Sequence, residues 1–153
     1  MSKIFAVAYF SDSITGTVKF IEEDNKVEIH VKLKGLTPSA RHGFHVHEYG
    51  DLSGGCQSTC THFNPYNKPH GGPTSKHRHV GDLGNLKTNK KGDVNSIFID
   101  NIIKLHGTAN IVGRGLVIHD GEDDFGLGGH PESLTTGNSG KRIACATIVY
   151  TKK

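Results

Sequence analysis

VEIHVKLK, at residues 27–34, alternates apolar and polar side chains without a break. This period of two is typical of a β-strand with one buried face and one solvated face. Gly35 and Pro38 then indicate a turn. Working outward, similar patterns predict strands at residues 44–47, 116–119 and 142–150, with weaker candidates at 4–10, 16–22, 84–88, 96–99 and 102–104. These patterns favour an all-β protein.

Length and composition agree with this fold class. The 153 residues suit one domain, residues 1–153, and 20 glycines favour many turns. The net charge of +3 is mild and no long basic run occurs, so nucleic-acid binding has little support. The apolar stretch at residues 4–7 is too short for a signal peptide, and no run is long enough to cross a bilayer. We therefore expect a cytoplasmic protein without a membrane partner.

Two long stretches, residues 50–81 and 120–141, lack strand patterning. Structureless connections of this length are uncommon in compact domains and usually carry function. The sequence therefore predicts a β-sandwich or barrel with two large functional loops.

Histidine is the unusual residue type, with 11 copies, and such an excess indicates a metal site or a pH switch. Seven closely spaced side chains are candidate ligands: His45, His47, His62, His70, His79, Asp82 and His119. The first two project from one strand face, about 7 Å apart, and can converge on one ion. The next loop carries two histidines and the aspartate that can fold around another, since imidazole suits copper and zinc and carboxylate can complete a zinc site.

His62 lies between these two groups in the sequence. Its imidazole has two nitrogens, and when fully deprotonated it can bind two ions. A bridging His62 would give each site four protein ligands. The five remaining histidines are interpreted as surface or hydrogen-bonded residues. We expect His77, His106 and His130 to be exposed. We expect His30 to lie on the polar side of its strand and His42 to pack or hydrogen-bond near the metal strand.

Several motifs resemble those of the copper–zinc superoxide dismutases. GFHVHEYGD at residues 43–51 is similar to that family's copper-ligand strand, and HFNP at 62–65, HGGP at 70–73 and HVGDLGN at 79–85 are similar to its zinc loop. VIH at 117–119 matches the last copper-ligand motif, and GNSGKRIAC at 137–145 matches the segment around the active-site arginine. The resemblance extends from about residue 4 to residue 150.

The resemblance implies an eight-stranded antiparallel Greek-key barrel, an Ig-like β-sandwich, and a homodimer. It implies one copper ion per chain, bound by His45, His47, His62 and His119. It implies one zinc ion per chain, bound by His62, His70, His79 and Asp82. The activity implied is superoxide dismutation, in which His62 bridges the metals, releases copper when copper is reduced, and takes up a proton.

Two further roles follow from the resemblance. Arg142 would receive the superoxide anion, because guanidinium stays charged and donates in a fixed fork. Asp123 would lie behind the metals and link His45 to His70, as ligating histidines generally need such partners. Asp124 adjoins it, so this assignment depends on the register from His119.

The family pattern pairs Cys56 with Cys145 in a disulfide; an unpaired structural thiol is the alternative. Cys60 departs from the family, which usually has glycine there. We interpret it as an inert thiol, with a rival disulfide partner for Cys56 and a stray copper ligand as alternatives. Thr135 also departs, because many members carry a lysine there that is thought to guide superoxide; Lys141 would partly substitute for it, while Glu132 is retained.

A superoxide oxidoreductase is the leading hypothesis, with superoxide as substrate. A copper chaperone or metal-buffering domain on the same fold is the alternative, but such domains often lose copper ligands and depend on an extra domain. A zinc-only structural β-domain is a third reading, which the intact copper set and Arg142 disfavour. A second copy of the chain and a copper chaperone that loads the metal are the expected protein partners.

Overall fold

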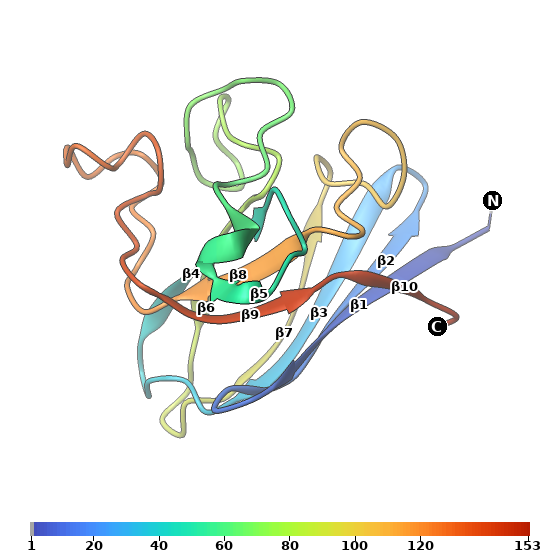
Figure 1. The fold of residues 1–153 in the computed structure, drawn as a ribbon, viewed down its shortest axis with the longest axis horizontal. Coiled ribbons are helices and arrows are strands. Elements are labelled where there is room, and N and C mark those ends of the chain that lie inside the picture. Colours follow the sequence, from blue (N-terminus) through green and yellow to red (C-terminus); the bar gives the residue numbers. More distant parts are fainter. Residues whose placement is uncertain (1) are drawn as a thin grey trace.

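The computed structural model describes residues 2–153 and consists almost wholly of β-structure (Figure 1). A single short 3-10 helix, Gln57–Thr59, is the only helical element in the described chain. The strands are β1 (Ile4–Ser11), β2 (Thr15–Glu23), β3 (Lys26–Lys34), β4 (Arg41–His47), β5 (Ser53–Cys56), β6 (Asp82–Lys87), β7 (Val94–Asp100), β8 (Gly115–His119), β9 (Arg142–Thr147) and β10 (Val149–Thr151). Across residues 2–153 there is no helix with the length and apolar character to span a membrane.

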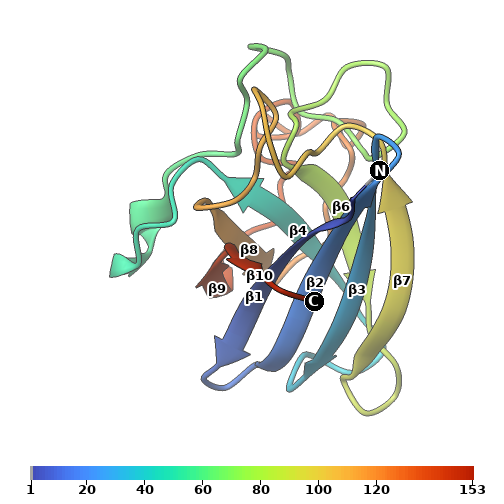
Figure 2. The ribbon, with the colours of Figure 1, turned by 90° about the vertical axis from the view of Figure 1, so that its right-hand side faces the viewer.

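Nine of these strands form two antiparallel sheets, with orders β10-β1-β2-β3-β7 and β6-β4-β8-β9 (Figure 2). The predicted all-β antiparallel architecture is confirmed. The β2–β3 hairpin turns at Asp24 and Asn25, whose φ angles of 52° and 64° suit a two-residue turn that matches the twist of the strands. The alternating stretch of the sequence becomes β3, with Val27, Ile29, Val31 and Leu33 buried.

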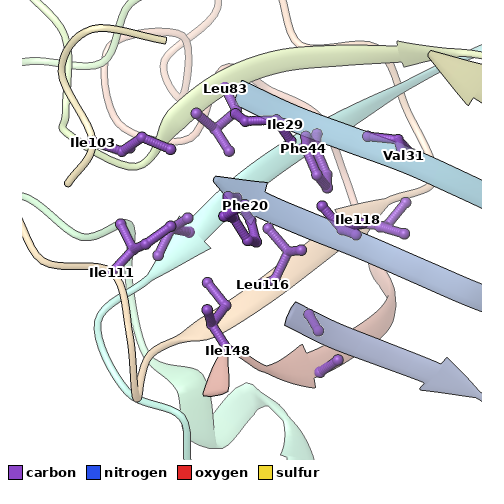
Figure 3. Close-up of a cluster of buried hydrophobic side chains, with 14 of the residues drawn as sticks. Phe20, Ile29, Val31, Phe44, Leu83, Ile103, Ile111, Leu116, Ile118 and Ile148 are labelled. Carbon is purple, nitrogen blue, oxygen red and sulfur yellow. The ribbon is translucent and has the colours of Figure 1, made fainter. Parts of the chain in front are cut away.

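The core lies between the two sheets (Figure 3). Phe20 and Ile29 from the five-stranded sheet face Phe44, Leu116 and Ile118 from the other, and all five side chains are fully buried. Phe44 and Val46 therefore fix which face of β4 points inward, and this alternation turns His45 and His47 to the opposite face.

The resemblance implied an eight-stranded Greek-key barrel or Ig-like β-sandwich, and the structure is a sandwich of two sheets that, in the described chain, do not close into a barrel. The chain instead crosses from one sheet to the other at Ile148: Thr147 pairs with Gly115 in one sheet and Val149 pairs with Val7 in the other. The fully buried Ile148 forms backbone hydrogen bonds with the loop before β8, so the predicted strand 142–150 is split into β9 and β10.

The two long stretches that were predicted to lack strands are mostly irregular in the structure. Residues 120–141 form no strand, as predicted, whereas the stretch 50–81 contains β5 and the 3-10 helix. The weak candidate strand at 102–104 was wrong, because only an isolated bridge joins Lys104 to Asn110 there. Figure 1 shows both long loops on the side of the four-stranded sheet. The loops are joined by the hydrogen bond between His70 and Asp123, and Asp123 also contacts His45 on β4.

Candidate metal centre

Three backbone segments meet at the base of the histidine cluster. Val46 N–H donates to Gly81 O (2.9 Å), Phe63 N–H donates to Val46 O (2.8 Å) and Gly81 N–H donates to Phe63 O (3.1 Å). We call this closed set of hydrogen bonds the backbone ring. A Cβ at Gly81 would lie 3.0 Å from the Val46 carbonyl carbon and closer to its oxygen, so the close approach requires glycine. The ring fixes the relative positions of the three segments that carry most candidate ligands.

The first group of donors comes from β4, the first loop and the end of β8. One ligand atom from each of His45, His47, His62 and His119 lies within 4.8 Å of the others, and all four residues are buried. His45 Nδ1 and the Nε2 atoms of the other three find no hydrogen-bond partner within residues 2–153. Buried polar atoms are rarely left without a partner, so four that converge point to a ligand.

Backbone carbonyls set the tautomers in this group. His47 Nδ1 donates to Cys60 O (2.9 Å), and His119 Nδ1 donates to Gly140 O (3.0 Å). A carbonyl accepts only, so each of these nitrogens carries the proton and leaves the Nε2 lone pair free. This is the state in which imidazole binds a metal ion.

Asp123 joins the two halves of the cluster. Its Oδ2 accepts from His45 Nε2 (2.6 Å) and its Oδ1 accepts from His70 Nε2 (2.7 Å). Asn85 brackets Asp123, because its side-chain oxygen accepts from Asp123 N–H (2.7 Å) and its amide donates to Asp123 O (3.0 Å). Both imidazole rings are thereby oriented by one buried carboxylate.

The second group surrounds Asp82 at the start of β6. Asp82 Oδ1 lies 3.0 Å from His62 Nδ1, 3.0 Å from His70 Nδ1 and 3.2 Å from His79 Nδ1, and the His62 and His79 atoms are 3.1 Å apart. Zinc bonds of about 2.0–2.1 Å in a tetrahedron put neighbouring ligand atoms about 3.3 Å apart. These four residues therefore fit a tetrahedral zinc site. His45 is an alternative to His79 as the fourth residue, since ligand atoms of His45, His62, His70 and Asp82 also lie within 4.8 Å of one another. His79 Nδ1 lies 3.1 Å from His62 Nδ1 and 3.2 Å from Asp82 Oδ1, while His45 Nδ1 belongs to the first group.

Burial keeps the first group neutral. It lowers the pKa of His45 well below the ordinary value, and the neighbouring His62 and His119 lower it further. Burial also lowers the pKa of His47, and it lowers the pKa of His119 to about 4. At pH 7 these imidazoles have free lone pairs, as metal binding requires.

The second group attracts positive charge. Burial alone would lower the pKa of His70, but hydrogen bonds to Asp123 and Asp82 raise it to about 9. Burial likewise opposes ionisation of Asp82, yet hydrogen bonds from His62, His70 and His79 hold the pKa of this carboxyl far below its ordinary value. Without a metal ion, the ionised Asp82 carboxylate is paired with a protonated His70 imidazole. A divalent cation can replace the positive charge of that imidazole.

A cavity of about 720 Å³ opens next to the first group, with His62 and His119 in its wall and Lys141, Arg142 and Glu132 around it. We call it the channel.

Arg142 is held in the channel wall by the loop it faces. Its Nη1 donates to Cys56 O (2.9 Å) and lies 3.3 Å from Thr59 Oγ1. The disulfide between Cys56 and Cys145, expected from the resemblance, is present and ties this loop to β9. The disulfide and the Arg142 hydrogen bond therefore both connect β9 to the loop around Cys56.

Comparison with known proteins agrees with this geometry. The sequence model of the copper/zinc superoxide dismutases matches residues 14–148. The chain belongs to the copper/zinc superoxide dismutase family. It is 55% identical over 150 residues to the copper–zinc superoxide dismutase of Paramecium bursaria Chlorella virus 1, covering 98% of this chain and 80% of the relative. It is 50% identical over 153 residues to that of Yarrowia lipolytica, covering 99% of each chain. The crystal structure of the clock protein EA4 superposes with a TM-score of 0.93 at 44% identity, covering 96% of this chain and 94% of that one.

Membership of the copper/zinc superoxide dismutases identifies the metals as copper and zinc. All seven ligand candidates predicted from the sequence come together, with Asp123 behind them. The remaining histidines lie elsewhere: His77, His106 and His130 are exposed, His30 contacts Glu28, and His42 donates to His119 O (2.8 Å).

Two carbonyls that orient ligands in this copper/zinc superoxide dismutase were not predicted. Every residue has a carbonyl, so no signal in the sequence distinguishes Cys60 or Gly140. The Cys60 thiol is exposed and forms no disulfide with the other cysteines of the described chain. Its φ of 66° lies in the left-handed region that favours glycine, which explains why the family usually has glycine at this position.

Proposed function

We propose that the protein dismutates superoxide with copper held by His45, His47, His62 and His119 and zinc held by His62, His70, His79 and Asp82. One observation carries the proposal: two sets of convergent donors share a single imidazole, that of His62. Its Nε2 belongs to the first set and its Nδ1 to the second. When bound, copper supplies a one-electron couple and zinc supplies a redox-silent positive charge.

His62 is the proposed proton-carrying residue. Dismutation of two superoxide ions to dioxygen and hydrogen peroxide consumes two protons, so a donor is needed beside the anion. His62 lines the channel, and burial lowers its pKa while Asp82 opposes this effect. A proton held at Nε2 is therefore weakly bound and available to the peroxide oxygen.

Arg142 is the proposed anion-binding residue. It lines the channel together with Lys141 and Lys68, against one acidic residue, Glu132. The excess of positive charge favours entry of a small anion, and low-dielectric walls strengthen that attraction. Its hydrogen bond to Cys56 O fixes the guanidinium, which leaves the remaining N–H groups for the anion.

Asp123 and the disulfide are proposed to support this site. Asp123 would keep His45 and His70 in the tautomers that metal binding needs. The Cys56–Cys145 bond would hold the loop whose carbonyl anchors Arg142.

Metal analysis combined with superoxide consumption tests the assignment. We expect one copper and one zinc ion per chain. The His119→Ala variant should lose turnover and copper, whereas Arg142→Ala should turn over more slowly with its copper retained. Arg41→Ala is the control, because the Arg41 side chain is exposed and does not line the channel. Full turnover after stringent removal of copper would refute the proposal.

Four further expectations stay proposals. The chain would be one folding domain, which a single cooperative unfolding transition tests. A homodimer is supported by exposed apolar side chains such as Leu52, Ile143 and Val149, and sedimentation velocity tests it. Delivery by a copper chaperone is tested by loading the protein with and without one. The cytoplasmic location is tested by cell fractionation.

A further inference from the structure

Arg78 is a buried arginine immediately before the candidate zinc ligand His79, and only 6% of it is exposed. Its guanidinium donates to three backbone carbonyls: Nε to His79 O (3.0 Å), Nη2 to Val80 O (2.7 Å) and Nη1 to Pro73 O (2.9 Å). These carbonyls lie on both sides of His79 in the first long loop. The side chain therefore gathers a stretch of loop that has no strand to hold it.

The same guanidinium is anchored to the five-stranded sheet. Nη1 also donates to Asp100 Oδ2 (2.7 Å), and side-chain exposure is 4% for both partners. Asp100 is the last residue of β7, and its Oδ1 accepts from Ile102 N–H (2.7 Å) and Ile103 N–H (2.9 Å). Ile103 is fully buried in the core. The contact thus connects the loop to a rigid part of the fold.

The far side of the same loop segment is held by the candidate zinc ligands. Asp82 Oδ2 accepts from His79 N–H (2.8 Å) and Gly71 N–H (3.0 Å), which leaves Oδ1 toward the histidines. His79 is therefore fixed at its N–H by Asp82 and at its carbonyl by Arg78. Neither contact uses Asp82 Oδ1 or the His79 ring, so the backbone of His79 is constrained by protein groups alone.

We propose that Arg78, anchored by Asp100, is a positioning residue that preorganises the zinc half of the site by fixing the backbone of His79. This rests on the proposed zinc assignment. A buried ion pair is weak support for stability, because desolvation of two charges offsets their attraction. Its four directed hydrogen bonds instead specify one loop conformation. The planar guanidinium, with its several N–H donors, can make all four hydrogen bonds at once, whereas the ammonium group of a lysine cannot.

The test is zinc retention by the loaded full-length protein in competition with a chelator, compared between wild type and Arg78→Lys. Partners behind metal ligands typically contribute about 10–100-fold in metal affinity, and we expect a loss in this range. Cobalt(II) placed at the zinc position should show a visible spectrum that departs from the wild-type tetrahedral form. Hydrogen exchange of residues 71–82 should become faster in the zinc-depleted variant.

Arg41→Lys is the matched control, since it alters an arginine–carboxylate pair whose side chains are 55% and 57% exposed, and it should leave zinc retention unchanged. If Arg78→Lys does not fold, Asp100→Asn decides the question, because its remaining oxygen can still accept from Ile102 and Ile103. A purely structural role would lower stability equally with and without zinc and leave zinc affinity and the cobalt spectrum unchanged, which would overturn the inference. A wild-type protein that takes up no zinc would overturn the ligand assignment as well.

Discussion

Replacing Gly81 by alanine would add a methyl group inside the backbone ring, where the added Cβ lies 3.0 Å from the Val46 carbonyl carbon and 3.3 Å from Phe63 N. Real Cβ contacts with backbone atoms are longer, so the three segments must move apart. Overpacking of this kind costs about 1–3 kcal/mol, and each of the two hydrogen bonds made by Gly81 contributes about 1 kcal/mol. We therefore expect the free energy of unfolding to fall by about 3–5 kcal/mol.

We expect metal content to fall even in the molecules that remain folded. Movement of β4 against the loop separates His45 from Asp82, and displacements near 1 Å are enough to disable a preorganised site. Guanidinium unfolding and metal content measured on the same preparation check both effects. Gly107→Ala is the control: its φ of 75° predicts some backbone strain, but a Cβ there has open space. A Gly81→Ala protein with wild-type stability and full metal content would refute the role of the backbone ring.

Three other predictions follow from the described contacts. Cys145→Ser opens a loop closed across 89 residues and should cost about 4–5 kcal/mol in denaturant unfolding, whereas Cys60→Gly should gain about 1 kcal/mol because it relieves a positive φ; equal stabilities would contradict both. Lys141→Gln should lower kcat/KM for superoxide at low ionic strength and converge with wild type at high salt, while Lys19→Gln, away from the channel, should not. In the metal-free protein, the pKa of His119 is lowered to about 4, below its unfolded value, so its share of stability is present above pH 6.5 and is lost as pH falls toward 4; that share is about 3 kcal/mol and should be absent in His119→Gln.

Much of the fold could be predicted because alternation of side chains reports directly on a half-buried strand. The alternation at residues 27–34 predicted β3 to within one residue. The apolar Phe44 and Val46 likewise predicted that His45 and His47 lie on the opposite face of β4. The crossing at Ile148 could not be predicted, since an apolar residue that turns between sheets has the same local pattern as one that stays in a strand. β5 was missed because SGGC has no apolar alternation.

The candidate site was predictable where side chains make it and unpredictable where the backbone does. Imidazole and carboxylate groups are chemically distinctive, so the candidate ligands could be proposed from the residues themselves, whereas Asp123 was proposed only from the resemblance to the copper–zinc superoxide dismutases. The backbone ring and the carbonyls of Cys60 and Gly140 depend on three-dimensional approach, which no residue type announces. Arg78 was invisible for the same reason, since its partners are mostly main-chain atoms.

The carboxylate of Asp123 accepts one hydrogen bond from the His45 ring and one from the His70 ring, and this shared contact has a thermodynamic consequence. Whatever improvement in copper affinity follows from a filled zinc half must be matched by an equal improvement in zinc affinity from a filled copper half, because such coupling is reciprocal. His45 and His70 would report on each other's occupancy through 2.6 Å and 2.7 Å hydrogen bonds. A favourable coupling would sort partly loaded preparations into full and empty molecules, and an unfavourable one would enrich molecules that hold a single ion.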